Sequence, residues 1–121
     1  LLYEKNGLLG ARTSFLITEE IEGKRLDKAI DQNTNVDLLV ARIESFFKRM
    51  NWIKVSHGDA KTSNFFINQK GLVTFDLDCS KKRKLNFFYN KAIYKDKNRI
   101  LKSLNKNDQL YLKLSKRLLE S

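Results

Sequence analysis

The stretch His57–Asn64, with the sequence HGDAKTSN, places residue types that handle phosphate within one short segment. Phosphoryl transfer from a nucleotide needs a carboxylate that orients the attacking hydroxyl, oxygen ligands for Mg²⁺ and a cation that meets the charge on the transferred group. Asp59 suits the first role, Asn64 the second and Lys61 the third. The same residue types also form ordinary turns, because Asp and Asn cap their own backbone. The segment alone therefore leaves both interpretations open.

A further oxygen ligand stands in the following segment VTFDLD, which contains Asp76. The segments NFFIN and LVTFDLD predict two strands, and Gly71 marks the hairpin turn between them. Because the second strand folds back, we expect Asp76, which it carries, to approach the loop with Asp59 and Asn64. Three oxygen-bearing side chains from two adjacent segments would then face one cavity, which favours a site over a plain turn.

The elements that position this loop follow from hydrophobic spacing. Residues Val36–Met50 carry apolar side chains at helical spacing, which predicts an amphipathic helix of roughly four turns, and Asn33–Asn35 offer N-caps. Strands are predicted over Leu1–Lys5 and Thr13–Ile21, and a short helix over Arg25–Ile30. Two closing helices are predicted; the apolar positions of the first are Phe88, Ala92, Ile93, Ile100, Leu101 and Leu104, and those of the second, which Asn107 and Asp108 cap, are Leu110, Leu114 and Leu118.

The predicted mixture of strands and helices is of the α+β class, and the composition fits a single domain with a modest core, since the chain has 121 residues of which 41% are hydrophobic. It has 24 Lys and Arg against 14 Asp and Glu, and the net charge of +10 favours anionic partners. A single cysteine, Cys79, excludes an internal disulfide and indicates a reducing compartment. No apolar run reaches the length that spans a bilayer, and no signal peptide is expected, because Glu4 and Lys5 interrupt the first residues.

The motif pair HGDAKTSN and VTFDLD resembles the catalytic loop and metal-binding strand of the protein-kinase-like fold. The glycine after the histidine is typical of the small-molecule branch, and the patterns HGDAKxSNF and FDLD are most similar to the bacterial lipopolysaccharide core kinases, which phosphorylate Kdo or heptose sugars. The resemblance implies ATP and Mg²⁺ as cofactors. Asp59 would orient the sugar hydroxyl and accept its proton, Lys61 would contact the transferred phosphate, and Asn64 and Asp76 would bind Mg²⁺. His57 would brace the loop.

The flanking segments resemble the same family. FLITEEIEGKRL is similar to the strand and hinge that hold adenine in this fold, so Thr18 would border the adenine pocket and the backbone of Glu19 and Ile21 would hydrogen-bond the base. YKDKNRILKSL is similar to a basic segment near the end of these sugar kinases. Asp78 stands where the fold usually has a glycine, and its role as a charge at the hairpin end, a metal neighbour or a substrate contact stays open.

The resemblance covers about Leu1 to Leu104 and implies a partial kinase-like domain. Residues 1–22 would form the end of the N-terminal lobe and the hinge, and residues 23–121 the helical C-terminal lobe. The first strands of the fold, its Gly-rich loop and its Lys–Glu pair have no counterpart in the chain, which therefore looks like a fragment, and these parts are expected upstream of Leu1. Because they position the phosphates and the metal, we expect this length of chain alone to be nearly inactive.

Three functions remain open on this basis. The first is an ATP-dependent kinase for a sugar hydroxyl on the lipid A–core, located in the cytoplasm or at the periphery of the inner membrane. The second is a phosphotransferase for a soluble acceptor of the aminoglycoside or choline type. The third is a basic binding module or an inactive kinase-like fragment. The basic tail from Lys81 onwards favours an anionic acceptor over a cationic one.

Two further groups of residues have a simple structural interpretation and a functional alternative. The basic run Lys81–Lys84 is predicted to be a solvated face, with contact to lipid phosphates or to the anionic inner leaflet as the alternative. Phe65, Phe66, Phe87 and Phe88 are predicted to pack in the core rather than to stack on bases, and no nucleic-acid partner is expected.

Overall fold

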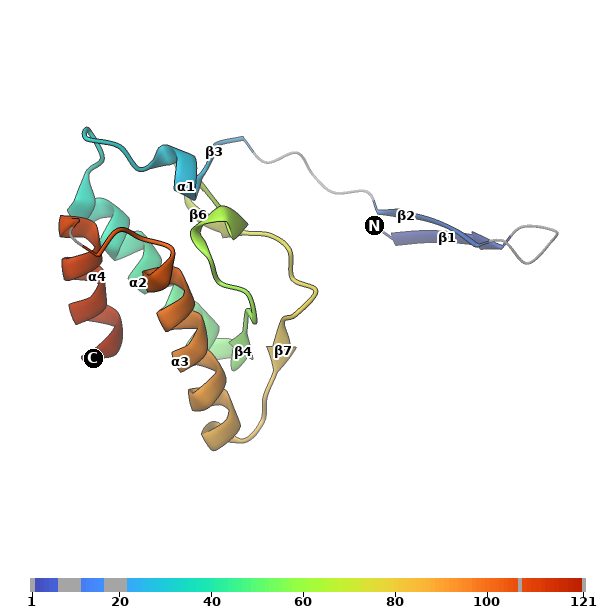
Figure 1. The fold of residues 1–121 in the computed structure, drawn as a ribbon. Helices are drawn as coiled ribbons and strands as arrows, with labels where there is room; N and C mark the ends of the chain where they lie inside the picture. Colours follow the sequence, from blue (N-terminus) through green and yellow to red (C-terminus); the bar gives the residue numbers. More distant parts are fainter. Residues whose placement is uncertain (1, 7–11, 17–21, 107, 121) are drawn as a thin grey trace.

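The computed structural model describes residues 2–6, 12–16, 22–106 and 108–120 (Figure 1). Strands and helices are mixed along the chain, so the predicted α+β class is confirmed. In chain order the elements are β1 (Leu2–Asn6), β2 (Arg12–Leu16), β3 (Lys24–Arg25), α1 (Leu26–Ala29), α2 (Val36–Ile53), β4 (Val55–Ser56), the 3₁₀ turn η1 (Thr62–Asn64), β5 (Phe65–Asn68), β6 (Gly71–Thr74), β7 (Lys81–Lys82), α3 (Asn86–Lys102) and α4 (Gln109–Leu119).

The first two strands form an antiparallel hairpin, in which Leu2 pairs with Leu16 and Asn6 with Arg12. Both strands were predicted, and β2 begins one residue earlier than expected. The remainder of the second predicted strand, residues 17–21, lies outside the described residues, and so do Thr18, Glu19 and Ile21. Their assignment to adenine therefore stays a prediction.

The helix α2 confirms the amphipathic pattern and continues three residues beyond the predicted end. The Asn35 side chain accepts a hydrogen bond from the Leu38 amide at 3.0 Å, which caps the helix start. At the other end Lys54 adopts the left-handed conformation that terminates helices, with φ of 57°. The buried face of α2 consists of Leu39, Val40, Ile43, Phe46, Phe47 and Met50.

The predicted hairpin is formed by β5 and β6, and β3 pairs with the free edge of β5. Arg42 of α2 donates to the carbonyl oxygens of Asn68 and Gln69 and so ties the hairpin turn to the helix. One expectation is wrong: β6 ends at Thr74, so Asp76 follows the strand instead of lying on it. The physical reason is that Asp76 has a φ of 58°, which an extended strand does not accommodate.

The core lies where helices α2, α3 and α4 meet, with the sheet of β3, β5 and β6 and the pair β4 and β7 beside them, while the hairpin of β1 and β2 lies apart (Figure 1). Both closing helices were predicted, and Asp108 occupies the N-cap position of α4, although its side chain makes no capping hydrogen bond. The expectation that four phenylalanines belong to the core is only half right. Phe65 is buried and Phe66 half-buried, whereas Phe87 and Phe88 are exposed, because Tyr89 occupies the core position of the first turn of α3.

Among the described helices, none combines the length and the apolar composition that crossing a bilayer requires.

Candidate functional site

The loop between β4 and η1 is anchored on its buried side by His57, whose side chain is completely buried. Its Nδ1 accepts a hydrogen bond from the Asp59 amide at 3.1 Å, so the ring proton is on Nε2, which lies 3.2 Å from the Phe75 carbonyl oxygen and donates to it. The ring therefore connects the loop with the segment that follows β6. This is a bracing arrangement, and it leaves no free ring nitrogen for chemistry.

Gly58 is required at its position for two reasons. Its φ of +88° is unfavourable for residues with a side chain, and a Cβ atom added there would lie 2.4 Å from the Cys79 carbonyl oxygen. The segment after β6 therefore passes directly against the loop. A glycine after the histidine is thus explained by this close backbone approach.

Asp96 of α3 anchors the loop from the other side, and the sequence analysis did not identify it. Its buried carboxylate accepts hydrogen bonds from the His57 amide at 2.6 Å and from the Gly58 amide at 2.9 Å. Burial raises the pKa of the Asp96 carboxyl, and the two amide donors oppose this shift only in part. A signal was present, because the spacing Ile93, Asp96, Ile100 puts an acidic residue on the apolar face of a helix.

Asp59 is the centre of a charged cluster at the top of this loop. Its Oδ1 accepts a hydrogen bond from Arg99 Nη1 at 2.8 Å, and its Oδ2 lies 3.1 Å from Asn64 Nδ2 and 3.6 Å from Lys61 Nζ. Partial burial raises the pKa of the Asp59 carboxyl, but Lys61, Asn64 and Arg99 together outweigh it, and the net pKa is lowered. The carboxylate is thus kept ionised and fixed in orientation while remaining partly accessible.

Arg99 is the second residue that the sequence analysis missed. It lies one turn after Asp96 on α3, so one helix supplies both the anchor of the loop and the partner of Asp59. Ser103, one turn further, accepts a hydrogen bond from the Thr62 amide at 3.1 Å. The segment YKDKNRILKSL therefore contains the side chains of α3 and its C-cap that contact the loop. Its basic composition was visible in the sequence, but its contacts with the loop were not.

Asn64 and Asp76, the two predicted metal ligands, are held by neighbouring backbone. The Asn64 amide nitrogen donates to the main-chain oxygen of Asp59 at 2.8 Å as well as to its carboxylate, which leaves Asn64 Oδ1 as the available ligand atom. Phe75, which precedes Asp76, donates its amide to the Asn64 carbonyl at 3.1 Å. The residue before Asp76 is therefore hydrogen-bonded to the loop, and the predicted approach of the Asp76 side chain to Asp59 and Asn64 stays a prediction.

The amide oxygen of Asn64 and the carboxylate of Asp76 suit Mg²⁺ better than they suit a metal ion whose ligands all come from the protein. One carboxylate and one amide oxygen are typical for Mg²⁺, which keeps several waters and shares its ligands with substrate phosphates. In the described part of the chain, no three His, Cys, Asp or Glu side chains gather as a possible metal cluster. The left-handed backbone of Asp76 is also a local strain of the kind that concentrates at functional sites.

An open depression of about 810 Å³ lies beside Arg99 on the surface of α3 and the turn after it. Three of its six lining residues, Lys95, Arg99 and Lys102, are basic, and the others, Tyr94, Asn98 and Ser103, are polar. Because Arg99 also contacts Asp59, this basic depression adjoins the charged cluster. A molecule in it would meet positive charge next to the carboxylate.

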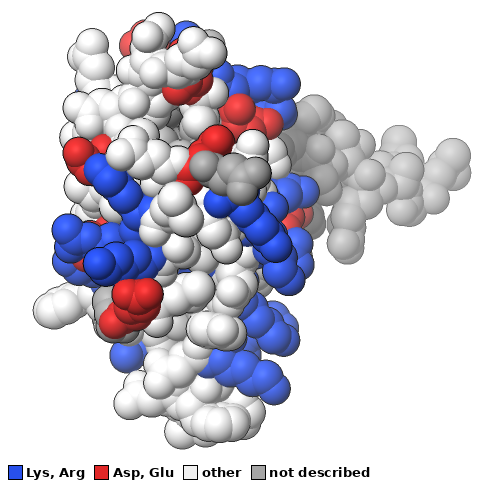
Figure 2. All heavy atoms as spheres, turned by 60° about the vertical axis from the view of Figure 1, so that its left-hand side comes forward, with Lys and Arg blue, Asp and Glu red and all other residues white. Residues whose placement is uncertain are grey.

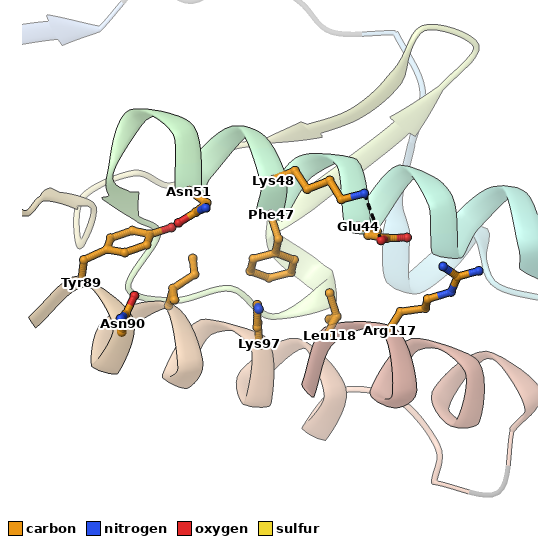
Figure 3. Close-up of a pocket in the computed structure, with 10 residues that line it drawn as sticks. Glu44, Phe47, Lys48, Asn51, Tyr89, Asn90, Lys97, Arg117 and Leu118 are labelled. Atoms are coloured by element: carbon orange, nitrogen blue, oxygen red, sulfur yellow. Dashed lines mark ion pairs between the residues drawn. The ribbon is translucent and has the colours of Figure 1, made fainter. Parts of the chain in front are cut away.

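A second hollow, of about 280 Å³, lies between α2 and the two closing helices (Figure 3). Phe47 and Leu118 form its apolar part, while Asn51, Tyr89 and Lys97 line its polar edge. Burial, followed by the charge of Asp96, raises the pKa of Tyr89 to about 12. Asp59, Lys61, Asn64 and Asp76 do not line this hollow, so it is separate from the charged cluster.

The comparisons with known proteins agree with the geometry of the loop. No curated protein sequence matches the chain. The model of one protein family, described as the lipopolysaccharide kinase (Kdo/WaaP) family, matches residues 1–120, which is nearly the whole chain. The family resemblance carried by HGDAKTSN and VTFDLD is therefore confirmed, and the chain belongs to the lipopolysaccharide kinase (Kdo/WaaP) family.

Proposed function

We propose that this chain is the phosphate-transferring part of a sugar kinase, which moves the γ-phosphate of ATP to a hydroxyl of a Kdo or heptose residue in the lipopolysaccharide inner core. The observation that carries the proposal is the Asp59 carboxylate, which Arg99, Asn64 and Lys61 surround on a loop that is hydrogen-bonded from two sides. Membership of the lipopolysaccharide kinase family supports the same reaction.

The proposed architecture is the helical C-terminal lobe of a protein-kinase-like fold, residues 23–121, preceded by the last strands and hinge of the N-terminal lobe in residues 1–22. The mixed strands and helices are compatible with this division. ATP would then lie against the hinge, with Thr18 beside the adenine and the backbone of Glu19 and Ile21 as its hydrogen-bonding partners. The acceptor sugar would approach from the side of α3.

In this reaction Asp59 orients the sugar hydroxyl and accepts its proton. Its Oδ1 already accepts a hydrogen bond from Arg99 and its Oδ2 one from Asn64, so an incoming hydroxyl would use a remaining lone pair of the carboxylate. Lys61, whose Nζ is 3.6 Å from Asp59 Oδ2, is close enough to contact a phosphate placed next to Asp59. The lowered pKa keeps Asp59 ionised at neutral pH, as a residue that orients a hydroxyl requires.

Asn64 Oδ1 and the Asp76 carboxylate would hold Mg²⁺ at the other side of the cluster. Bound Mg²⁺ supplies charge neutralisation for the phosphates and fixes their geometry. The amide of Asn64 already orients its oxygen away from Asp59, since its nitrogen is hydrogen-bonded there. The loop thus separates the group that faces the hydroxyl from the groups that face the metal.

The basic depression supports an anionic acceptor. Lys95, Arg99 and Lys102 would attract the carboxylate of Kdo or a phosphate of the inner core, and they would repel a cationic aminoglycoside or choline. The acceptor would be the lipid A–core, so the reaction would take place at the cytoplasmic face of the inner membrane. This observation favours the sugar kinase over the soluble-acceptor alternative.

The test measures transfer of labelled γ-phosphate from ATP with Mg²⁺ to Kdo-bearing lipid A, with choline and an aminoglycoside as competing acceptors. We expect transfer to the anionic acceptor only, and a loss of about a hundredfold or more in Asp59→Asn, as for removal of a catalytic base. Asp108→Asn, an exposed aspartate on the loop before α4, is the matched control and should retain activity.

A binding measurement covers the case in which the chain alone turns over too slowly to measure. ATP with Mg²⁺ should raise the thermal unfolding temperature of the chain, because a ligand that binds only the folded state stabilises it. Asp76→Asn should remove the Mg²⁺-dependent part of the increase. The proposal is refuted if the wild type shows no phosphate transfer and no stabilisation by ATP with Mg²⁺. Undiminished transfer in Asp59→Asn would refute the role of that residue.

A further inference from the structure

A group of large apolar side chains is exposed at the end of the molecule where α2 finishes and α3 begins. Trp52 is 86% exposed, Phe87 74% and Phe88 52%, and Ile53 and Leu85 are exposed beside them in the sequence. Together these five residues form what we call the apolar tip. Single exposed apolar residues are common on soluble proteins, but five of them gathered at one end of the molecule mark a surface that contacts another apolar phase.

The two segments of the apolar tip are brought together by hydrogen bonds of the adjoining backbone. Arg83 donates its amide to the Lys54 carbonyl at 2.9 Å, and β4 pairs with β7 immediately before α3. The Lys54 ammonium also lies 4.9 Å from the centre of the Tyr89 ring, on the first turn of α3. The residues directly before Lys54 and those directly before Tyr89 therefore share one end of the molecule, the lower end in Figure 1.

The two segments that carry the apolar tip contain basic residues and no acidic one. Residues 45–58 and 79–95, the two segments that carry the tip, contain no Asp or Glu. Lys81, Lys82 and Lys84 are exposed directly before Leu85. Figure 2 shows uncharged atoms at the lower end of the molecule, with Lys and Arg side chains immediately above them. An apolar surface that adjoins exposed lysines is complementary to anionic headgroups over acyl chains.

We propose that the apolar tip docks on the surface of an anionic phospholipid bilayer. Trp52, Phe87 and Phe88 enter the interfacial region, where amphipathic and aromatic rings partition, and the lysines of residues 81–84 lie against the lipid phosphates. Two features of the tip favour a bilayer over other occupants. A second copy would bring the same positive charge against itself, and the aliphatic Ile53 and Leu85 contribute nothing to stacking on nucleic-acid bases.

The proposed function already places the reaction at the inner membrane. The inference adds to it the surface that makes the membrane contact, and it holds for any sugar acceptor. It also gives α3 a second use. The helix begins at the apolar tip with Asn86 and carries Arg99 roughly 20 Å further along its axis, at about 1.5 Å per residue. The charged cluster is therefore carried on the same rigid element as the docking surface.

Trp52 makes the test direct, because it is the only tryptophan in the chain. Its emission should shift to shorter wavelength when the chain is mixed with vesicles of phosphatidylcholine and phosphatidylglycerol, and lipids brominated in the acyl chain should quench it. Vesicles of phosphatidylcholine alone should bind much more weakly. Vesicle sedimentation gives the partition constant, which should fall as salt is added, since salt screens the lysines.

Variants separate the apolar from the electrostatic contribution while keeping Trp52 as the reporter. Phe87→Ser with Phe88→Ser should lower the partition constant about tenfold or more, because apolar area no longer leaves water. Lys81→Gln, Lys82→Gln and Lys84→Gln together should lower it on the order of a hundredfold. The control changes the exposed Leu112→Ser together with Lys106→Gln and Lys116→Gln outside the tip, and it should bind as the wild type does.

Far-UV circular dichroism checks that each variant is folded, which the exposure of the altered side chains favours. Several results would overturn the proposal. They are an unchanged Trp52 emission with anionic vesicles, equal binding to neutral vesicles, and equal loss in the control variant. A blue shift that grows with protein concentration without vesicles would assign the tip to a second copy. A stronger response to a single-stranded oligonucleotide would assign it to nucleic acid.

Discussion

Two carboxylates next to the same loop have opposite environments, and the contrast separates their roles. Asp96 is buried, burial raises its pKa, and both of its oxygens are occupied by backbone amides. Asp59 is partly accessible, and the cations and the amide around it lower its pKa. The first is a structural anchor, whereas the second stays charged and partly accessible. Functional sites often contain two carboxyl groups whose environments shift their pKa values in opposite directions, so that each group has a different role.

Arg99→Gln should raise the pKa of the Asp59 carboxyl, because the variant loses one of the cations that oppose the effect of partial burial. The carboxylate would then be protonated at a higher pH than in the wild type. The measurement is an NMR titration of the Asp59 side-chain carboxyl carbon, which needs no turnover. In an active protein the acidic limb of the pH–rate profile should move upwards in the same direction.

Arg49→Gln is the matched control for this titration, since Arg49 is an exposed arginine of α2. Its Asp59 titration should coincide with that of the wild type. An unchanged Asp59 midpoint in Arg99→Gln would mean that the 2.8 Å ion pair is not populated in solution.

At the scale of residues, local spacing decided what could be predicted. Asp59, Lys61 and Asn64 lie within six positions, so their convergence follows from the loop itself. Asp96 and Arg99 are about forty positions further along, and only the packing of α3 brings them to the loop. Phosphate chemistry could be inferred from the first group, whereas the residues that hold Asp59 in place required the tertiary structure.

At the scale of elements, α3 and its C-cap residue support the loop through three side chains. Asp96 accepts from the amides of His57 and Gly58, Arg99 pairs with Asp59, and Ser103 accepts from Thr62. These residues recur at helical spacing, so a rigid helix presents all of them at once. The loop is therefore fixed by a helix that follows it in sequence rather than by its own hydrogen bonds alone.

Asp96→Asn should destabilise the protein by about 2–3 kcal/mol, because the amide can accept from only one of the two N–H groups, of the buried His57 and of Gly58, and leaves the other without this partner. Urea unfolding gives the free energy. Hydrogen exchange should accelerate at His57 and Gly58. Ser103→Ala is a graded comparison, with a loss of about 1 kcal/mol and faster exchange at Thr62. Unaltered exchange at His57 and Gly58 in Asp96→Asn would contradict the anchoring role.

The sequence predicted the elements better than their ends. Periodicity located α2, α3 and α4, because each buries a continuous apolar stripe. It placed Asp76 on a strand, because FDLD alternates like one, but the backbone turns left-handed at Asp76 to pass the loop. It also placed Phe87 and Phe88 in the core, since composition alone does not distinguish a buried aromatic ring from one at a docking surface.

At the scale of the whole molecule, the charged cluster depends on packing that lies far from it. The loop rests on α3, α3 packs against α4, and α4 packs against α2. Leu110, Leu114 and Leu118 are the buried face of α4, and Lys113 pairs with Asp37 of α2 at 2.7 Å. The hydrophobic periodicity of α4 was visible in the sequence. The sequence did not show which element α4 packs against, because the apolar stripe of any other helix could cover the apolar face of α4.

Leu114→Ala tests whether these parts form one cooperative unit. Leu114 is fully buried, so truncation leaves a cavity and should cost about 2–5 kcal/mol in the free energy of unfolding. Leu112→Ala on the same helix is the matched control, because Leu112 is 59% exposed, and it should change stability by less than about 0.5 kcal/mol. Urea unfolding followed by far-UV circular dichroism measures both.

Hydrogen exchange decides how far the effect of Leu114→Ala extends. If α2, α3, α4 and the loop unfold together, the slowest-exchanging amides of the loop and of α2 should lose the same free energy of protection as the variant loses in global stability, since both report the one opening reaction. Accelerated exchange confined to Gln109–Leu119 would instead make α4 a separately unfolding segment. In that case the orientation of Asp59 would depend on α3 and its contacts with the loop, without support from the rest of the helical core.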